Sequence, residues 1–481
     1  SEELPHFLSM LTHQAPIESR FVAGLVDNLN AEVVLGTVSS VAEGAAWLGY
    51  TYLFVRMLRN PLAYGVAWAE LAADPRLEGR RRALVSEAAK QLEECRMVRF
   101  DERSGALHAT ELGRIASHFY VSAATVVAWS ECLRPAMTEA DFLAMLSRSS
   151  EFENVALRDD EASELEELSR NACPFDVRAG GGGGNKDKKK GGGGSGGGRY
   201  GDAGEDLYSK VTTSSSGPGA TTQGRAVPAT ATKHGKVSVL LQAYVSRARP
   251  DAFSLVADSN YVAANAPRLC RAAFEILVRR GWPGAAELAL SFCKAFDQRL
   301  WPHQHPLRQV EAHAQRLAGG GGGAGGGRQR LFGRNGPPGS ASAIGDEALS
   351  RLEERAISLD VLADASAPEI GAMLRSPAAG EAVAAAVRRF PHLELSARLQ
   401  PLTAGVVRLS LSLVPSFEWS DRCHGGGGGS SLRWHVWVED SEGTRMHHAE
   451  LWTMTKRMAV EAAEAMRLRG GDDDGELDLD S

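Results

Sequence analysis

The chain has 481 residues, of which 43% are hydrophobic, so it can form about three domains with buried cores. Its 53 basic and 60 acidic side chains give a formal charge of −7, which argues against one basic surface wrapped around nucleic acid along its whole length. The most apolar stretch, Val41 to Val55, contains Glu43 and ends at Arg56. The sequence therefore predicts no membrane span and no membrane partner.

The first eleven residues carry acids where a secretory signal would be basic and then apolar. The six cysteines stand singly, without a CxxC pair, which is typical of reduced thiols rather than of a disulfide framework. We therefore expect a nuclear or cytoplasmic location. The chain starts without Met, and we interpret residues 1–15 as the end of a preceding domain.

Glycine accounts for 52 residues and is concentrated in runs at 180–198, 319–327 and 425–429. Such runs cannot bury enough apolar area to offset their conformational entropy. We therefore expect a disordered Gly/Ser-rich insertion at 179–232 and a Gly-rich linker at 318–342.

Residues 16–109 have the pattern of a winged helix, in which helices precede a two-stranded wing. Ser40 and Glu43 match a capping box, which marks the start of a helix that ends at Asn60-Pro61. A turn at 102–105 separates two short alternating strands. In chain order, the predicted elements are helices over 17–28, 41–58 and 80–95 and strands over 97–100 and 106–109.

Beyond the wing, we expect residues 110–178 and 233–317 to form the two parts of one helical bundle that the insertion splits. Proline and glycine interrupt the second part at Pro250, Gly281–Pro283 and Trp301–Pro302.

Residues 343–391 contain short Ala- and Leu-rich helices with the lengths of a helix-hairpin-helix domain. The pattern then changes from helical to alternating, which predicts strands over 392–460. We expect an immunoglobulin- or fibronectin-like β-sandwich there, followed by an acidic tail at 461–481. The fold class is therefore mainly α with a C-terminal β domain.

The sequence lacks the motifs of nucleotide-hydrolysing sites and of metal-binding sites. Gly235-Lys236 is followed by Val237 and lacks the upstream glycine of a G-x-x-x-x-G-K-[ST] phosphate loop. Asp346 and Glu347 are interpreted as the acidic start of a helix, and the histidines have no partners at ligand spacing. We expect no catalytic, cofactor or metal site in this chain.

Residues 225–334 contain 16 basic and 6 acidic side chains, a local charge of +10 against −17 for the rest of the chain. Tyr261–Arg280 predicts one long helix there. Its expected core face is Val262, Ala266, Leu269, Ala273, Ile276 and Leu277. The expected opposite face is Tyr261, Asn265, Arg268, Ala272 and Arg279, with Arg271 beside it. Such a row can meet successive phosphates of a single strand, and the alternative is a merely solvated face.

Further strings stand out in order along the chain. They are PIES at 16–19, LNAEVVLGT at 29–37, WLGYTY at 47–52, NPLAYG at 60–65, LGRIASH at 112–118 and SLVADS at 254–259. These strings resemble the Ski-two-like helicases with duplicated cassettes, and within them the helicase subunits of activating signal cointegrator complexes. The resemblance implies two upstream motor domains that bind ATP and Mg, of which residues 1–15 are the tail. It also implies a winged helix and a Sec sixty-three homology unit whose sandwich is incomplete, because the family sandwich continues beyond Val460.

The same resemblance implies which residues contact nucleic acid. Tyr261–Arg280 matches the family's ratchet helix, and Arg268 falls on its strand-contacting arginine. Asn265 is the next candidate from the resemblance. With Arg271 and Arg279 from the basic face of the helix, the predicted nucleic-acid-binding residues are Arg268, Asn265, Arg271 and Arg279. Pro267 departs from the pattern, because a proline inside a helix removes a donor and clashes with the carbonyl of Ala263.

We expect the accessory nucleic-acid-binding module of an ATP-dependent 3′-to-5′ RNA or DNA helicase, which guides the translocated single strand. Its partners are then single-stranded RNA or DNA, motor domains in cis or in trans, and other subunits of a helicase complex. The alternative is a protein-interaction scaffold that resembles a degenerate cassette in a repair, ribosome-rescue or spliceosomal complex. A third interpretation is a translocon subunit that shares the Sec sixty-three homology unit. The predicted winged helix and the absence of predicted membrane spans argue against it.

Overall fold

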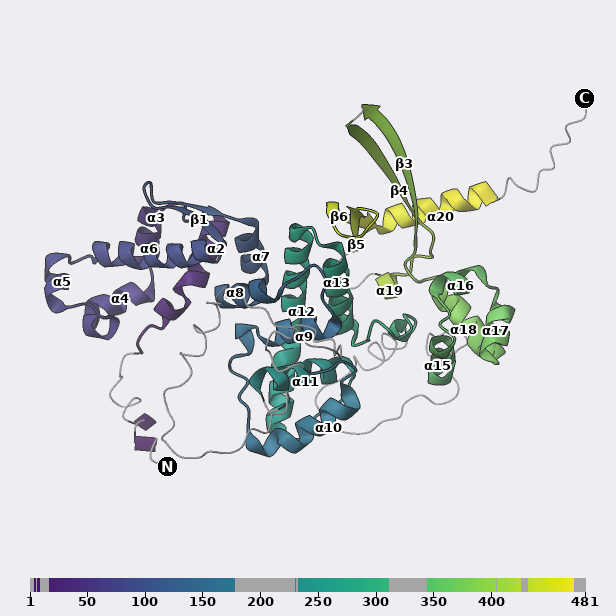
Figure 1. Ribbon diagram of the computed structural model, residues 1–481, viewed down its shortest axis with the longest axis horizontal. Coiled ribbons are helices and arrows are strands. Elements are labelled where there is room, and N and C mark those ends of the chain that lie inside the picture. Colours follow the sequence, from purple (N-terminus) through teal and green to yellow (C-terminus); the bar gives the residue numbers. More distant parts are fainter. Residues whose placement is uncertain are drawn as a thin grey trace, which may run out of the picture.

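Helical units follow one another in a row, from the winged helix at one end of the molecule to the helix-hairpin-helix domain and the β-hairpins at the other (Figure 1). This computed structural model describes residues 17–177, 230, 232–310, 344–403, 405–424 and 431–470, together with residues 4, 5, 7 and 8. The predicted linker 318–342 and nearly all of the predicted insertion 179–232 lie outside the described residues.

The winged helix ends in the predicted wing, in which β1 (Val98–Asp101) pairs antiparallel with β2 (Ala106–Ala109). Gly105 supplies the left-handed φ of 71° in the turn between them. The preceding helices are η1 (Phe21–Gly24), α2 (Leu25–Leu35), α3 (Val41–Leu48), α4 (Tyr52–Arg59), η2 (Pro61–Tyr64), α5 (Trp68–Ala73) and α6 (Glu78–Glu94). The predicted hairpin and the predicted helix over 80–95 are confirmed.

The helix expected over 17–28 is wrong at both ends, because residues 17–20 are held in a non-helical conformation against α4 and α2 continues to Leu35. The Glu18 carboxylate accepts hydrogen bonds from Arg56 at 2.7 and 3.2 Å, from Asn60 at 2.8 Å and from Tyr64 at 2.8 Å. These donors, Arg56 above all, lower the pKa of Glu18 to about 2.

The helix expected over 41–58 is divided into α3 and α4. Thr51 adopts an extended backbone, and its hydroxyl caps the N-terminus of α4. Ser40 caps α3 as predicted, and the Glu43 carboxylate accepts from the backbone and hydroxyl of Ser39 at 2.7 Å each. The cap at Thr51 therefore starts a new helix within an apolar stretch whose pattern predicted one continuous helix.

The bundle continues directly from the wing. Its helices are α7 (Glu111–Phe119), α8 (Ala123–Cys132), α9 (Glu139–Ser147), η3 (Ser150–Phe152), η4 (Asp159–Glu161), α10 (Ala162–Ala172), α11 (Lys233–Val245), α12 (Phe253–Arg280) and α13 (Pro283–Gln298). A side chain at Gly113 would meet the carbonyl oxygen of Met97 at 2.1 Å, so only glycine fits where α7 crosses β1. Phe142 and Phe292 stack at 5.1 Å and join the two parts of the bundle. The winged helix and the bundle share one hydrophobic core.

The helix-hairpin-helix region has a core of its own, which includes Leu349, Ile370 and Val383. Its helices are α15 (Asp346–Glu354), α16 (Leu359–Asp364), α17 (Ala367–Leu374) and α18 (Pro377–Val387). A side chain at Gly380 would meet Gly371 at 2.5 Å, so this pair of glycines lets α17 and α18 cross closely.

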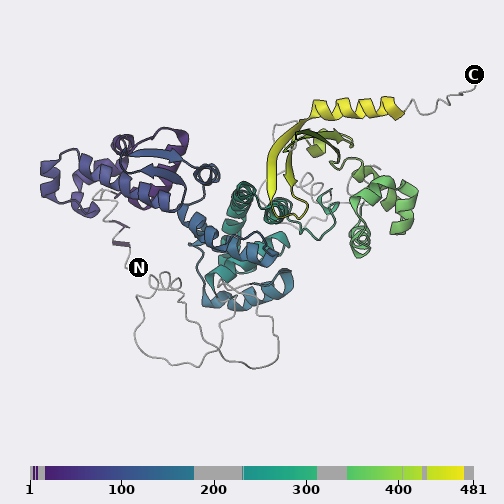
Figure 2. The ribbon, with the colours of Figure 1, turned by 45° about the horizontal axis from the view of Figure 1, so that its top comes forward.

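Four strands and a final helix complete the described chain. β3 (Leu393–Thr403) pairs with β4 (Val406–Pro415), and β5 (Ser431–Glu439) pairs with β6 (Met446–Thr455). The short α19 (Asp421–His424) lies between the pairs in sequence. The helix α20 (Lys456–Gly470) packs on β4 and β6 and extends toward the C-terminus (Figure 2). Within the described residues, the strands form two separate antiparallel pairs rather than the expected sandwich, and they end at Thr455, directly before α20 begins, rather than at residue 460.

Candidate nucleic-acid interface

The predicted ratchet helix is α12, which runs for 28 residues from Phe253 to Arg280 and passes through Pro267 without ending. It begins eight residues before the predicted start at Tyr261. Glu164 of α10 fixes the chain where the helix begins, because its carboxylate accepts the N–H groups of the two residues that precede α12, Asp251 at 2.5 Å and Ala252 at 3.2 Å. The interpretation of Tyr261–Arg280 as one continuous helix is confirmed.

The predicted core face of α12 is confirmed, since all six of its residues are buried. The opposite face is less regular than predicted, because Ala272 is fully buried rather than exposed. The reason is that α12 packs on several neighbours, including α7, α11 and α13. A helix surrounded in this way keeps only separate exposed positions, and the predicted stripe is interrupted.

Arg268 lies where α12 meets the end of α7. Its Nη1 donates to the carbonyl oxygens of Phe119 at 3.1 Å and of Tyr120 at 2.6 Å. Its Nε and Nη2 donate to Asn265 Oδ1 at 3.1 and 2.7 Å, and the Asn265 amide donates to the carbonyl of Tyr261. The guanidinium thus holds the C-terminal carbonyls of α7, where a cation also complements the helix dipole.

Arg271 and Arg279 point to other neighbours. Arg271 pairs with Asp297 of α13, and Arg279 pairs with Glu111 of α7 at 3.4 Å. Their side chains are 49% and 63% exposed. Ion pairs this accessible contribute about 0.2–1 kcal/mol, so a phosphate group can replace either carboxylate at little cost.

The four predicted binding residues therefore divide into two kinds. Arg271 and Arg279 are accessible cations in weak ion pairs. Arg268 and Asn265 are partly buried and hydrogen-bonded to each other and to the backbone. Arg268 and Asn265 lie together at the end of α7, Arg279 lies near the start of α7, and Arg271 pairs with α13.

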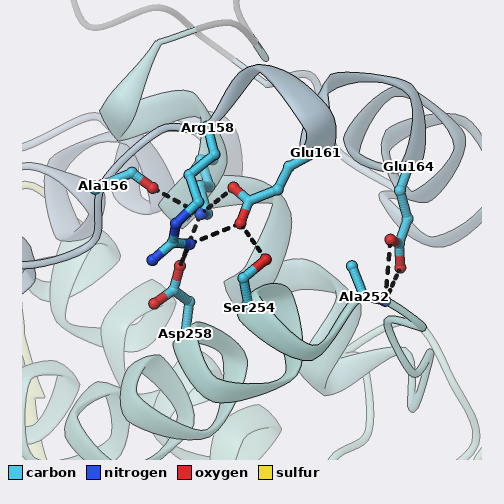
Figure 3. Close-up of polar contacts among 8 residues, drawn as sticks. Ala156, Arg158, Glu161, Glu164, Ala252, Ser254 and Asp258 are labelled. Carbon is cyan, nitrogen blue, oxygen red and sulfur yellow. Dashed lines mark hydrogen bonds and ion pairs between the residues drawn. The ribbon is translucent and has the colours of Figure 1, made fainter. Parts of the chain in front are cut away.

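A buried charge cluster that the sequence did not predict joins the two parts of the bundle (Figure 3). Lys236 of α11 is fully buried, and its Nζ donates to Ala156 O at 2.7 Å, to Asp258 Oδ2 at 2.7 Å and to Glu161. Arg158 Nη1 also contacts both carboxylates, at 2.7 Å to Glu161 and 3.2 Å to Asp258. Lys236 directly precedes the mainly apolar stretch 237–241, which was the available signal of a buried lysine with partners.

Electrostatics in this cluster favour the charged form of Glu161. Burial alone raises the pKa of Glu161, but hydrogen bonds from Lys236, Ser254 and Arg158 outweigh it and lower the pKa overall. All three donor positions of Lys236 have acceptors, so this lysine is a structural cation. It is unsuited to binding the phosphates of a nucleotide.

The described histidines and cysteines form no metal site. Among the residues that the structure describes, no group of three or more His, Cys, Asp and Glu side chains could hold a metal. His305 is a core residue, and its Nε2 lies 3.0 Å from Ile357 O. Cys270 and Cys293, isolated in sequence, place their Sγ atoms 3.4 Å apart in the core, where burial raises the pKa of Cys270 well above its ordinary value.

Over the described ranges, no helix is long and apolar enough to cross a membrane.

Comparison with known proteins agrees with this architecture. The fold defines a winged-helix protein that carries a helical bundle, a helix-hairpin-helix region and paired strands. Residues 18–94 match the family described as a winged helix-turn-helix domain, and residues 109–190 and 206–469 match the family described as the Sec63 Brl domain. The chain therefore belongs to the Sec63 Brl domain family.

Similar proteins are helicases or subunits of a cointegrator complex. The chain is 40% identical to the DExH-box ATP-dependent RNA helicase DExH14 of Arabidopsis thaliana over 458 residues. It is 34% identical to activating signal cointegrator 1 complex subunit 3 from Dictyostelium discoideum and from Homo sapiens. Each comparison covers 95% of this chain and 17% of the relative, so the chain corresponds to a small part of each of those proteins.

Proposed function

We propose that this chain is the accessory nucleic-acid-binding module of an ATP-dependent 3′-to-5′ RNA or DNA helicase and guides a single strand along α12. The observation that carries the proposal is the pair of exposed, weakly paired arginines on α12, Arg271 and Arg279, in the most basic part of the chain. The name of the Arabidopsis relative, an ATP-dependent RNA helicase, supports it. Arg268 and Asn265 remain candidates on the same helix.

In this proposal, ATP and Mg bind to motor domains supplied in cis or in trans, and other subunits of a helicase complex dock on the same chain. The module works in the nucleus, the cytoplasm or both. Its own residues bind and orient the strand. Arg271 and Arg279 exchange Asp297 and Glu111 for backbone phosphates, so binding depends on salt and little on base sequence.

Binding of a fluorescent single-stranded RNA, followed by anisotropy over a range of salt concentrations, tests this function. Each lost phosphate contact should lessen the log-log salt slope by about 0.7 for a single strand. The double variant Arg271→Ala/Arg279→Ala should therefore lessen it by about 1.4. Arg170→Ala is the matched control, because Arg170 is an exposed arginine of the same bundle paired with Glu166.

A protein-interaction scaffold is the second candidate function, and one observation favours it. The register of β3 and β4 places Leu395, Leu399, Leu409 and Leu411 on one face of the hairpin. Leu395 and Leu399 are 63% and 70% exposed. A contiguous exposed apolar face is typical of protein interaction sites. The scaffold alone predicts no binding of the single-stranded RNA.

A further inference from the structure

Tyr120 is an exposed aromatic residue at the junction between the winged helix and the bundle. Its side chain is 83% exposed, and its phenol has no hydrogen-bond partner within the described residues. Its backbone is left-handed, with φ 54° and ψ 46°, where it ends α7. Glycine usually takes this position because a side chain disfavours the conformation. Packing of the ring therefore does not explain why a tyrosine stands here.

The backbone around this tyrosine is nevertheless held by several bonds. The Tyr120 carbonyl accepts from Arg268 at 2.6 Å, and the N–H groups of Tyr120 and Val121 bond back to the last turn of α7. Arg268 is itself fixed by Asn265. Other helices of the described chain also end at a left-handed non-glycine residue, for example at Arg299 and Arg375, so the backbone alone marks a helix end. What distinguishes Tyr120 is an exposed ring on a residue whose carbonyl Arg268 holds in place.

The α7–α12 contact places this ring near the proposed path of the strand. Glu111 at the start of α7 pairs with Arg279, and Tyr120 just beyond its end contacts Arg268, so the two helices run antiparallel. Arg268 and Arg279 are eleven residues apart on α12, which is close to three turns and about 16 Å. A few nucleotides span that distance, so one strand can meet Arg279 with a phosphate and Tyr120 with a base.

We propose that Tyr120 is a platform on which a base of the single strand stacks, and that Arg268 is a positioning residue that holds the platform. The inference rests on the proposed function and names a contact within it. Stacking on an aromatic ring tolerates any base, because every base has a π-face. Stacking therefore strengthens the binding only of strands that carry bases, and it leaves the number of phosphate contacts unchanged.

The test compares oligothymidylate with an abasic oligomer of the same length and charge. Tyr120→Gly removes the ring and suits the left-handed backbone, Tyr120→Phe keeps the ring, and Tyr50→Ala is a matched control at a tyrosine that is 92% exposed. Tyr120→Gly should weaken oligothymidylate binding about tenfold and leave abasic binding and the salt slope unchanged. Tyr120→Phe and Tyr50→Ala should bind both ligands as the wild type does.

Arg268→Gln separates positioning from direct contact. It should reduce the preference for oligothymidylate over the abasic oligomer without changing the salt slope. A slope lessened by about 0.7 would mean that Arg268 touches a phosphate and would overturn its positioning role. Equal loss of both ligands, or no loss, in Tyr120→Gly would overturn the stacking platform. If the wild type binds neither ligand, the proposed function itself fails.

Discussion

Lys236→Met should loosen the contact between the two parts of the bundle. The substitution keeps the aliphatic stem of the lysine, so it leaves no cavity, but it removes the cation shared by Glu161 and Asp258. Glu161 is fully buried and precedes the insertion in sequence, whereas Lys236 and Asp258 follow it. The perturbation therefore acts on the charge cluster that joins the two parts.

Removing one partner of a buried ion pair typically costs about 3–5 kcal/mol. Arg158 still contacts both carboxylates after the substitution and is partly exposed, so we expect the lower end, about 3 kcal/mol. The wild type should lose stability as the pH falls through the lowered pKa of Glu161, because its carboxylate is then protonated in the folded state. That dependence should weaken in Lys236→Met, which lacks the main donor that lowers this pKa.

Native-state hydrogen exchange of the α11 amides measures the free energy of local opening directly. Lys233→Met is the matched control, because Lys233 lies one turn earlier on the same helix and is exposed. It should change the opening free energy by no more than about 0.5 kcal/mol. In a double-mutant cycle, Lys236→Met and Glu161→Gln should cost less together than the sum of their separate effects. Equal opening energies in Lys236→Met and Lys233→Met would refute the reasoning.

Three further predictions concern catalysis, the insertion and the N-terminal segment. The purified chain with RNA and Mg-ATP should release no phosphate above buffer, because no phosphate loop is present; turnover that co-purifies with the protein would contradict this. A protease site engineered between residues 190 and 200 should give two fragments that remain associated on gel filtration, since Phe142–Phe292 stacking and the Lys236 cluster join them; separated fragments would show that the insertion organises the bundle. Glu18 should stabilise the winged helix fully above pH 4.5 and lose this effect as the pH falls toward 2, since its pKa is lowered in the folded state; Glu18→Gln should flatten that part of a pH-dependent melting profile, and an unchanged profile would exclude the effect.

Much of the fold could be predicted from local signals in the sequence. The wing, α6 and the breaks around α12 follow from turn residues, prolines and helical periodicity, which act within a few residues. The core face of α12 was also predictable, because apolar spacing alone identifies the side of a helix that packs. The start of α12 was not, since Glu164, which accepts the N–H groups of the two residues before the helix, lies 87 residues earlier than the first of them.

The site was less predictable, because the bonding partners of its residues are far away in sequence or are backbone groups, which no residue type identifies. Arg268 bonds to the carbonyls of Phe119 and Tyr120, and every residue offers such a carbonyl, so no residue type marks the contact. The buried environment of Ala272 comes from neighbouring helices rather than from its own helix. Lys236 could have been suspected from its apolar surroundings, but Glu161 lies 75 residues away across the insertion.

The salt dependence of single-strand binding tests the central claim most directly. The full chain should bind single-stranded RNA with an affinity that falls as salt rises, and Arg271→Ala/Arg279→Ala should lessen the log-log slope by about 1.4 while Arg170→Ala leaves it unchanged. All variants should keep the wild-type melting temperature, because the ion pairs removed are exposed. Binding that is absent in the wild type, or a slope that the double variant leaves unchanged, would contradict the proposal that α12 guides a nucleic-acid strand.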